Sequence, residues 1–102
     1  MKYQLVLQWP CSSNADYDRL ISLEETIRDG LGEVGIVDGH DYGSGEMNIF
    51  IHTDEPAMAF EKARMLLDLG KDFGHLKAGY RDFEQDEYIA IFPQGTKDFS
   101  VA

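Results

Sequence analysis

Residues 38–56, with the sequence DGHDYGSGEMNIFIHTDEP, contain two histidines and several carboxylates that could bind a metal ion or take part in catalysis. Imidazole and carboxylate groups together are ligands that zinc, manganese or iron accept. The metal-competent residues here are Asp38, His40, Asp41, Glu46, His52 and Asp54. His40 and His52 lie at opposite ends of an expected strand, and a six-residue strand spans about 17 to 20 Å. They could not share one ion without an unusual loop path, so we assign no metal ligand and expect no cofactor.

The same stretch is rich in turn-forming residues. Asp38-Gly39 and Gly43-Ser44-Gly45 suit turns, because glycine takes positive φ and aspartate bonds its own backbone. We favour a plain hairpin connection. The alternatives are a metal site and a ligand-binding loop, and the loop candidates are Asp38, His40, Asp41 and Glu46. A phosphate loop is excluded, because the glycines precede a strand and no lysine stands nearby.

The single cysteine, Cys11 in WPCSSN, lies between an expected strand end and an expected helix start. A helix dipole at that place could lower the pKa of a thiol and make it a nucleophile. No resolving cysteine exists and no histidine is adjacent in sequence, which favours an incidental or buried cysteine. We therefore assign no catalytic residue. His75, between Gly74 and Leu76, is expected to be an ordinary loop or strand-edge residue.

Two segments alternate between apolar and polar side chains, as half-buried strands do. Their inward sets are expected to be Tyr3, Leu5, Leu7 and Trp9, and Met47, Ile49 and Ile51. Their outward sets are Gln4, Val6 and Gln8, and Asn48, Phe50 and His52. The outward residues are the candidate binding residues, because their face is neither fully polar nor fully apolar.

The remaining elements follow from spacing and from helix-end residues. A helix is expected up to Leu31, and its N-cap candidates are residues 12–14 and 16. Gly30 is expected to be its left-handed C-terminal residue, and Glu24 is expected on its solvated face. A second helix follows Thr53 or Asp54, which can cap it, and stops at Gly70. Further strands are expected over 33–38, 76–83 and 87–92. Residues 38–45 are then a connection, and the tail from Pro93 is a loop.

The resulting order is βαββαβ with an extra C-terminal strand, within one domain that spans 1–102. This pattern predicts an α+β, ferredoxin-like sandwich, in which two helices cover one face of an antiparallel sheet. The last strand places either Tyr88, Ala90 and Phe92, or Ile89 and Ile91, on the other face. We expect a homodimer to cover that face, because such a patch on a monomer usually marks a contact.

Composition restricts the partners. Nineteen acidic and nine basic residues give a net charge of -10, which repels nucleic acid and anionic membranes and attracts cationic surfaces. An RNA-binding role for Phe50 is excluded on this ground. A helix face carrying Asp16, Asp18, Glu24 and Glu25 could join Asp54, Glu55, Glu61 and Asp82 in one acidic surface. No internal disulfide is possible and no membrane segment or leader is seen, so we expect a cytoplasmic protein.

The segment 39–51, GHDYGSGEMNIFI, resembles small uncharacterised bacterial proteins of ferredoxin-like type. The resemblance implies a fold and assigns no catalytic residue. Three classes of function remain. The first, which we favour, is a small acidic protein-interaction module that binds a cationic protein, as immunity proteins do. The second is a regulatory ferredoxin-like dimer that binds a small molecule. The third is a metal- or thiol-dependent enzyme.

Overall fold

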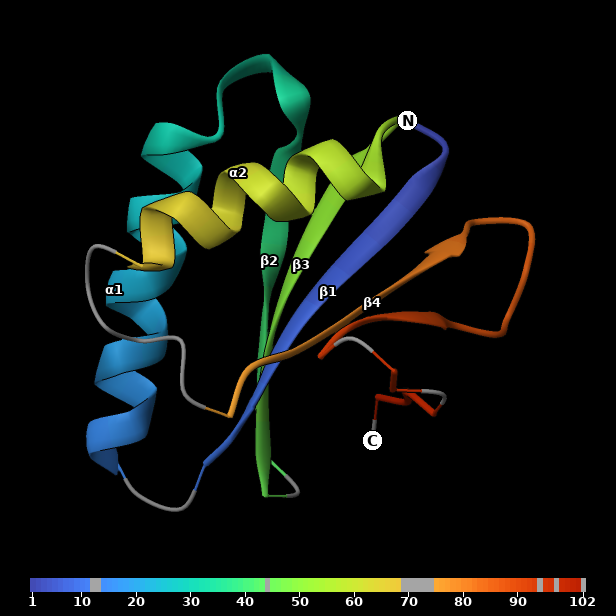
Figure 1. Ribbon diagram of the computed structural model, residues 1–102. Helices are drawn as coiled ribbons and strands as arrows, with labels where there is room; N and C mark the ends of the chain where they lie inside the picture. Colours follow the sequence, from blue (N-terminus) through green and yellow to red (C-terminus); the bar gives the residue numbers. More distant parts are fainter. Residues whose placement is uncertain (12–13, 44, 69–74, 94, 97, 102) are drawn as a thin grey trace.

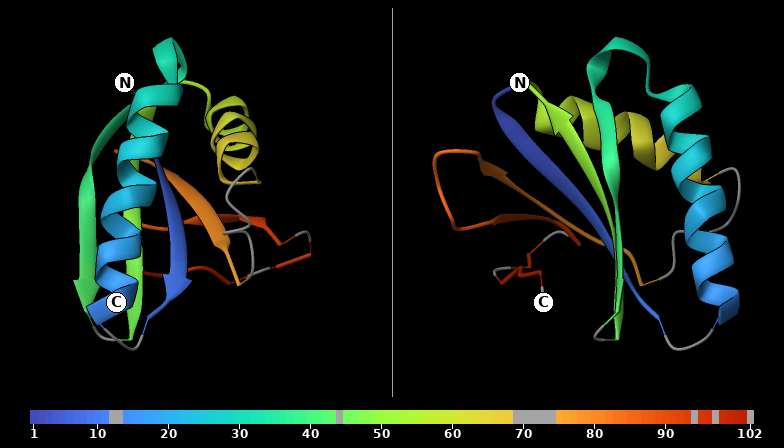
Figure 2. Two further views of the ribbon diagram at one scale, coloured as in Figure 1. Left: turned by 90° about the vertical axis from the view of Figure 1, so that its left-hand side faces the viewer. Right: turned by 180° about the vertical axis from the view of Figure 1, so that it is seen from behind.

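The computed structural model describes residues 1–11, 14–43, 45–68, 75–93, 95–96 and 98–101. Its elements are β1 (Tyr3–Pro10), α1 (Asn14–Gly30), a 3-10 turn (Gly32–Val34), β2 (Ile36–Gly43), β3 (Glu46–Thr53), α2 (Pro56–Asp68), β4 (Lys77–Asp82) and β5 (Ile89–Phe92). The strands form one antiparallel sheet in the order β2-β3-β1-β4-β5. The fold is therefore α+β, with both helices on one face of the sheet (Figures 1 and 2).

The face of the sheet toward the helices carries the core. Leu5 pairs with Ile51, and Leu7 with Ile49, in the antiparallel register of β1 and β3. These residues, Trp9 and Met47 are buried together with apolar side chains of both helices. The predicted inward set is confirmed, apart from Tyr3, which is only partly buried and packs edge-on against Tyr80. Alternation of period two thus fixes which face each residue takes.

Gly30 lies directly against the Leu66 side chain of the second helix. A Cβ built on Gly30 would lie 2.5 Å from Leu66 Cδ2 of α2. The expectation of a left-handed residue at Gly30 is wrong, because the positive φ of +66° belongs to Gly32. Gly30 is instead the last residue of α1 and allows α2 to approach.

The second strand lies later in the chain than expected. Residues 32–34 form a 3-10 turn, and β2 continues through the stretch 38–43 that was expected to be a connection. Asp38 lies at a register shift between Val37 and Gly39, so this pair forms a bulge inside the strand. Gly43 (φ +151°) and Gly45 (φ +79°) make the hairpin, as predicted. Ser44 lies outside the described residues.

Helix α2 begins as the sequence predicts. The Thr53 hydroxyl accepts a hydrogen bond from the Glu55 N–H (2.9 Å) and donates one to the Val34 carbonyl (2.7 Å). Pro56 occupies the first helical position, where its missing N–H costs nothing. The expected stop at Gly70 and the cap candidates Ser12 and Ser13 lie outside the described residues. Asn14 is the first helical residue of α1.

The last two strands are shorter than expected, at Lys77–Asp82 and Ile89–Phe92. Ala90 pairs with Gly79, which places it on the outer face. A register shift between Ala78 and Gly79 then turns Phe92 to the helix side, where its ring packs against Phe60. The proposed set of Tyr88, Ala90 and Phe92 is therefore not continuous on the outer face, and Ile91 packs against the core.

The C-terminal segment, residues 95–96 and 98–101, lies on the outer face of the sheet, and Figure 1 shows it on the side opposite α1. The Gln8 Nε2 donates a hydrogen bond to the Ser100 carbonyl (2.9 Å). A Cβ on Gly79 would lie 2.7 Å from the Phe99 ring, so Phe99 packs directly on that glycine. Val6, the register partner of Gly79, is 0% exposed. The chain itself thus supplies part of the cover that we expected from a second copy.

Within the described ranges, neither helix has the length and apolar character needed to cross a bilayer.

Candidate functional site

Three candidate residues from two paired strands meet on the outer face. Gln8 Nε2 donates to Glu46 Oε2 (2.9 Å) and to Asn48 Oδ1 (3.0 Å), and Asn48 Nδ2 donates to Glu46 Oε2 (3.1 Å). Gln8 and Asn48 are register partners on β1 and β3, which explains how they meet. We refer to Gln8, Glu46 and Asn48 as the amide cluster.

The amide cluster is held tightly. Asn48 is 0% exposed and Gln8 is 9% exposed. The two N–H bonds of Gln8 Nε2 serve three acceptors, namely Glu46, Asn48 and the Ser100 carbonyl, so at least one bond is shared. Buried polar groups with satisfied bonds rigidify a site. The cluster therefore fixes the Glu46 carboxylate at the end of the sheet.

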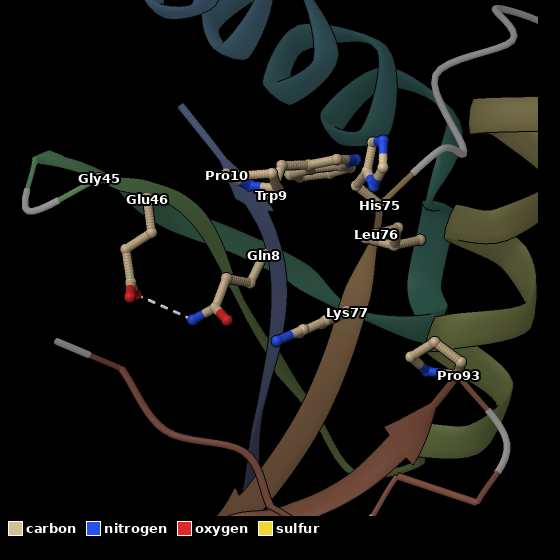
Figure 3. Close-up of a pocket in the computed structure, with 9 residues that line it drawn as sticks. All are labelled: Gln8, Trp9, Pro10, Gly45, Glu46, His75, Leu76, Lys77 and Pro93. Atoms are coloured by element: carbon tan, nitrogen blue, oxygen red, sulfur yellow. Dashed lines mark hydrogen bonds between the residues drawn. The ribbon is translucent and has the colours of Figure 1, made fainter. Parts of the chain in front are cut away.

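A pocket of about 470 Å³ opens beside the amide cluster, where β1 ends and β3 and β4 begin (Figure 3). Its lining residues are Gln8, Trp9, Pro10, Gly45, Glu46, His75, Leu76, Lys77 and Pro93. Lys77 is the register partner of Gln8 on the other side of β1. The pocket thus combines an apolar wall, a buried amide, a carboxylate and an ammonium group.

The other outer-face candidates lie away from this pocket. Gln4 Oε1 accepts hydrogen bonds from Tyr88 Oη (2.9 Å) and Arg81 Nε (3.3 Å). His52 lies 3.5 Å from an Asp38 carboxylate oxygen and stacks edge-on with Phe83 at 4.9 Å between ring centres. Val6 is buried and can contact no partner while the C-terminal segment is in place.

One end of the outer face stays open. Ile36 is 60% and Phe83 39% exposed, and Phe50 is partly exposed. Ile36 pairs with His52 in the register of β2 and β3. A half-apolar patch therefore remains beyond the C-terminal segment.

His40 lies on the helix side of β2, since it pairs with the core residue Ile49. Its Nδ1 lies 2.9 Å from Glu24 Oε2 of α1. Glu24 is only 6% exposed and also faces Arg28 (3.7 Å), so its expected place on a solvated face is wrong. His40 and His52 point to opposite faces, and Asp41 is exposed. Among the described residues no group of three His, Cys, Asp or Glu side chains could hold a metal ion.

Cys11 is not activated. Partial burial and, next, the Asp16 carboxylate raise the pKa of its thiol. A hydrogen bond with the Gly43 backbone lowers this pKa, and the Glu46 carboxylate, which has the smallest effect, raises it. Burial, followed by Cys11 and Asp16, also raises the pKa of Tyr42. The alternative of a lowered thiol pKa is therefore not supported, because desolvation and the nearby Asp16 carboxylate raise it, and the favoured interpretation of an incidental, partly buried cysteine stands.

A second hollow, of about 560 Å³, lies between the 3-10 turn and the start of α2. Its lining residues are Met1, Leu31, Glu33, Val34, Asp54, Glu55, Met58 and Lys62. Met58 is 59% exposed, and the three acidic residues are exposed around it. We call Glu33, Asp54, Glu55 and Met58, with the apolar residues beneath them, the acidic-rimmed hollow.

Sequence reasoning missed several members of these sites. Lys77 and Pro93 reach the pocket only through strand pairing and chain reversal, which no local pattern reports. Glu33 and Glu55 reach one hollow because the 3-10 turn packs beside α2 through the Thr53–Val34 hydrogen bond. The exposed Met58 at the start of an amphipathic helix is the one signal that could have been noticed.

Comparison with known proteins gives no matching family model, no matching curated protein and no matching solved structure.

Proposed function

We propose that this protein is an acidic protein-interaction module that binds a cationic protein partner through the acidic-rimmed hollow. The observation that carries the proposal is the combination of an apolar floor with a rim in which three carboxylates outnumber one lysine. Glu33, Asp54 and Glu55 surround the hollow, and Lys62 is the one basic side chain in its described lining. A partner would insert an apolar side chain flanked by lysine or arginine.

The physical argument has two parts. When a partner covers exposed apolar surface such as Met58, the free energy of binding becomes more favourable by about 25 cal/mol per Å² of buried apolar area. Methionine is flexible and polarisable, which suits an adaptable contact surface. The net charge of -10 raises the association rate with a cationic partner, and the rim sets its orientation.

We further propose that the fold is ferredoxin-like. The strand order β2-β3-β1-β4 around two helices supports this, with β5 added at the edge. The resemblance of segment 39–51 to bacterial proteins of ferredoxin-like type points the same way. The size and net charge of the chain are similar to those of immunity proteins, which supports the proposal, whereas the fold by itself assigns no function.

The test uses the capped basic peptide KKLKK as a probe. We expect saturable binding at low salt and several-fold weaker binding at high salt, because exposed charges are screened. KKGKK should bind more weakly, since it lacks the apolar side chain, and EELEE should not bind.

Matched variants locate the surface. Glu33→Gln with Glu55→Gln removes two rim charges, and Asp18→Asn with Glu25→Gln removes two exposed charges on α1. We expect the rim pair to weaken KKLKK binding several-fold more than the α1 pair. Equal effects would mean that binding follows total charge alone and would overturn the assignment of the hollow.

A further inference from the structure

The outer face of the sheet carries a docked peptide, which is the C-terminal segment of the same chain (Figure 1). The Phe99 ring lies on Gly79, where an added Cβ would be 2.7 Å from two ring carbons. It also packs edge-on against Tyr88, with 5.4 Å between ring centres. The Ser100 carbonyl accepts a hydrogen bond from Gln8 Nε2 (2.9 Å). An aromatic anchor followed by one backbone carbonyl therefore describes the kind of segment that this surface accepts.

The surface under the Phe99 ring is built by the sheet and its last hairpin. Val6, Gly79 and Ala90 are register partners in one row across β1, β4 and β5. Gly79 has no side chain, which leaves space for a ring above this row. Tyr88 forms the wall, and its hydroxyl donates a hydrogen bond to Gln4 Oε1 (2.9 Å). We refer to Val6, Gly79, Tyr88 and Ala90 as the aromatic notch.

The polar contacts of the segment can be broken without leaving a buried donor unpaired. Among the described residues, 98–101 join no strand ladder, and their one hydrogen bond to the sheet is the bond from Gln8. Gln8 Nε2 has two N–H bonds, and Glu46 and Asn48 also accept from it. Both N–H bonds therefore keep an acceptor when the segment leaves. A competing segment has to replace mainly the contact of the Phe99 ring.

The segment matches its surroundings poorly in charge. Asp98 lines one hollow of about 550 Å³ together with Asp86 and Glu87 from the loop between β4 and β5. All three carboxylates are exposed, so they repel one another most strongly at low salt. A segment with lysine or arginine at the position of Asp98 would replace this repulsion by attraction.

We propose that the aromatic notch is a second docking site, for an extended segment of a partner protein in which lysine or arginine precedes phenylalanine. The C-terminal segment covers the notch until such a segment displaces it. The partner phenylalanine replaces Phe99 on Gly79, the carbonyl of the next residue takes the Gln8 hydrogen bond, and the cation faces Asp86 and Glu87. The site goes beyond the proposed function, because it shares no described lining residue with the acidic-rimmed hollow.

The test uses the full chain with Phe99→Ala, which lacks the aromatic anchor of its own segment. The labelled variant is titrated at low salt with the capped peptides KFSV, DFSV and KASV, and its amide NMR signals report both folding and binding. DFSV is the chain's own sequence over 98–101. We expect saturable shifts at Val6 and Gln8 with KFSV. DFSV should bind several-fold more weakly because of its charge, and KASV roughly tenfold or more weakly because it lacks the ring.

The wild type measures how well the segment covers its own notch. A tethered segment competes at an effective concentration in the millimolar range. KFSV should therefore bind the wild type at least roughly tenfold more weakly than it binds Phe99→Ala. Tyr17→Ala removes an exposed ring on α1 and is the matched control, which should bind KFSV as the wild type does.

Further substitutions in the Phe99→Ala chain locate the two contacts. Adding Gly79→Ala places a Cβ where the ring should lie, so KFSV should then bind no better than KASV. Adding Asp86→Asn with Glu87→Gln should remove the preference for KFSV over DFSV. Adding Asp18→Asn with Glu25→Gln changes the net charge equally and should leave that preference intact.

Absence of saturable KFSV binding to Phe99→Ala would overturn the proposal, as would equal binding of KFSV and KASV. Equal KFSV binding to the wild type and to Phe99→Ala would show that the segment does not compete for the notch, and would also overturn it. These outcomes leave the interaction module standing, because KKLKK addresses Glu33 and Glu55. Loss of KKLKK binding with retained KFSV binding would in turn reject only the acidic-rimmed hollow.

Discussion

Glu24 of α1 and His40 of edge strand β2 are joined by a contact of 2.9 Å between Oε2 and Nδ1, with Glu24 almost fully buried. This contact ties the first helix to the outermost strand. Tyr17 packs edge-on against both His40 (6.0 Å between ring centres) and Tyr42 (5.2 Å), which extends the connection toward the hairpin.

Replacing Glu24 by alanine should destabilise the protein by about 1 to 3 kcal/mol, because His40 and Arg28 lose a buried partner. The free energy of unfolding in urea measures this. Glu25→Ala, one residue along and exposed, is the control and should stay within about 0.5 kcal/mol. Equal losses for the two variants would show that the Glu24–His40 contact stabilises nothing.

Gly79→Ala should displace the C-terminal segment from the sheet. The added Cβ would lie 2.7 Å from the Phe99 ring, and the Ile89 carbonyl at 3.2 Å leaves little room to move. We expect faster proteolytic removal of the C-terminal residues. We also expect faster hydrogen exchange at the Gln8 side-chain amide, which donates to the Ser100 carbonyl. Gly39→Ala is the control, since a Cβ there meets no atom within 4 Å. An unchanged cleavage rate in Gly79→Ala would contradict the packing of Phe99.

Cys11 should react slowly with iodoacetamide near neutral pH. A raised pKa means that less thiolate is present at a given pH, so the rate profile should lie at higher pH than that of free cysteine. Asp16→Asn removes one of the charges that raise the pKa and should move the profile to lower pH. A profile below that of free cysteine would mean that the helix dipole dominates after all.

The homodimer stays a prediction, now restricted to the open end of the outer face. Ile36, Phe50 and Phe83 are the side chains that a second copy would cover there. Phe50→Glu should then convert a dimer to a monomer in light scattering, because a charge would be buried in the contact. Asp41→Ala, exposed on the same strand pair, should leave the dimer intact. A wild type that is monomeric would exclude this use of the face.

The sequence predicted the layers of the fold better than its sites. Period-two alternation placed Leu5, Leu7, Ile49 and Ile51 correctly, because one buried face fixes the register of a strand. The bounds of β2 could not be predicted, since an edge strand with Asp38 in a bulge and His40 and Asp41 exposed has the composition of a loop.

Among the candidate residues, Gln8, Asn48 and Glu46 do converge, because β1 and β3 are paired in register. Lys77 could not be added from sequence, since its place beside Gln8 depends on the pairing of β4 with β1. The burial of Val6 depends on a C-terminal segment that folds back over the outer face near Gln8 and Gly79, and no local pattern reports such a reversal.

The most direct test of the interaction module is to map where a basic peptide binds. With the methionine methyl groups labelled, KKLKK should shift the Met58 signal strongly, and the shift should be lost in Glu33→Gln with Glu55→Gln. Met47, which is 1% exposed in the core, serves as the internal control and should not move. Saturable peptide binding that leaves Met58 unshifted would contradict the account.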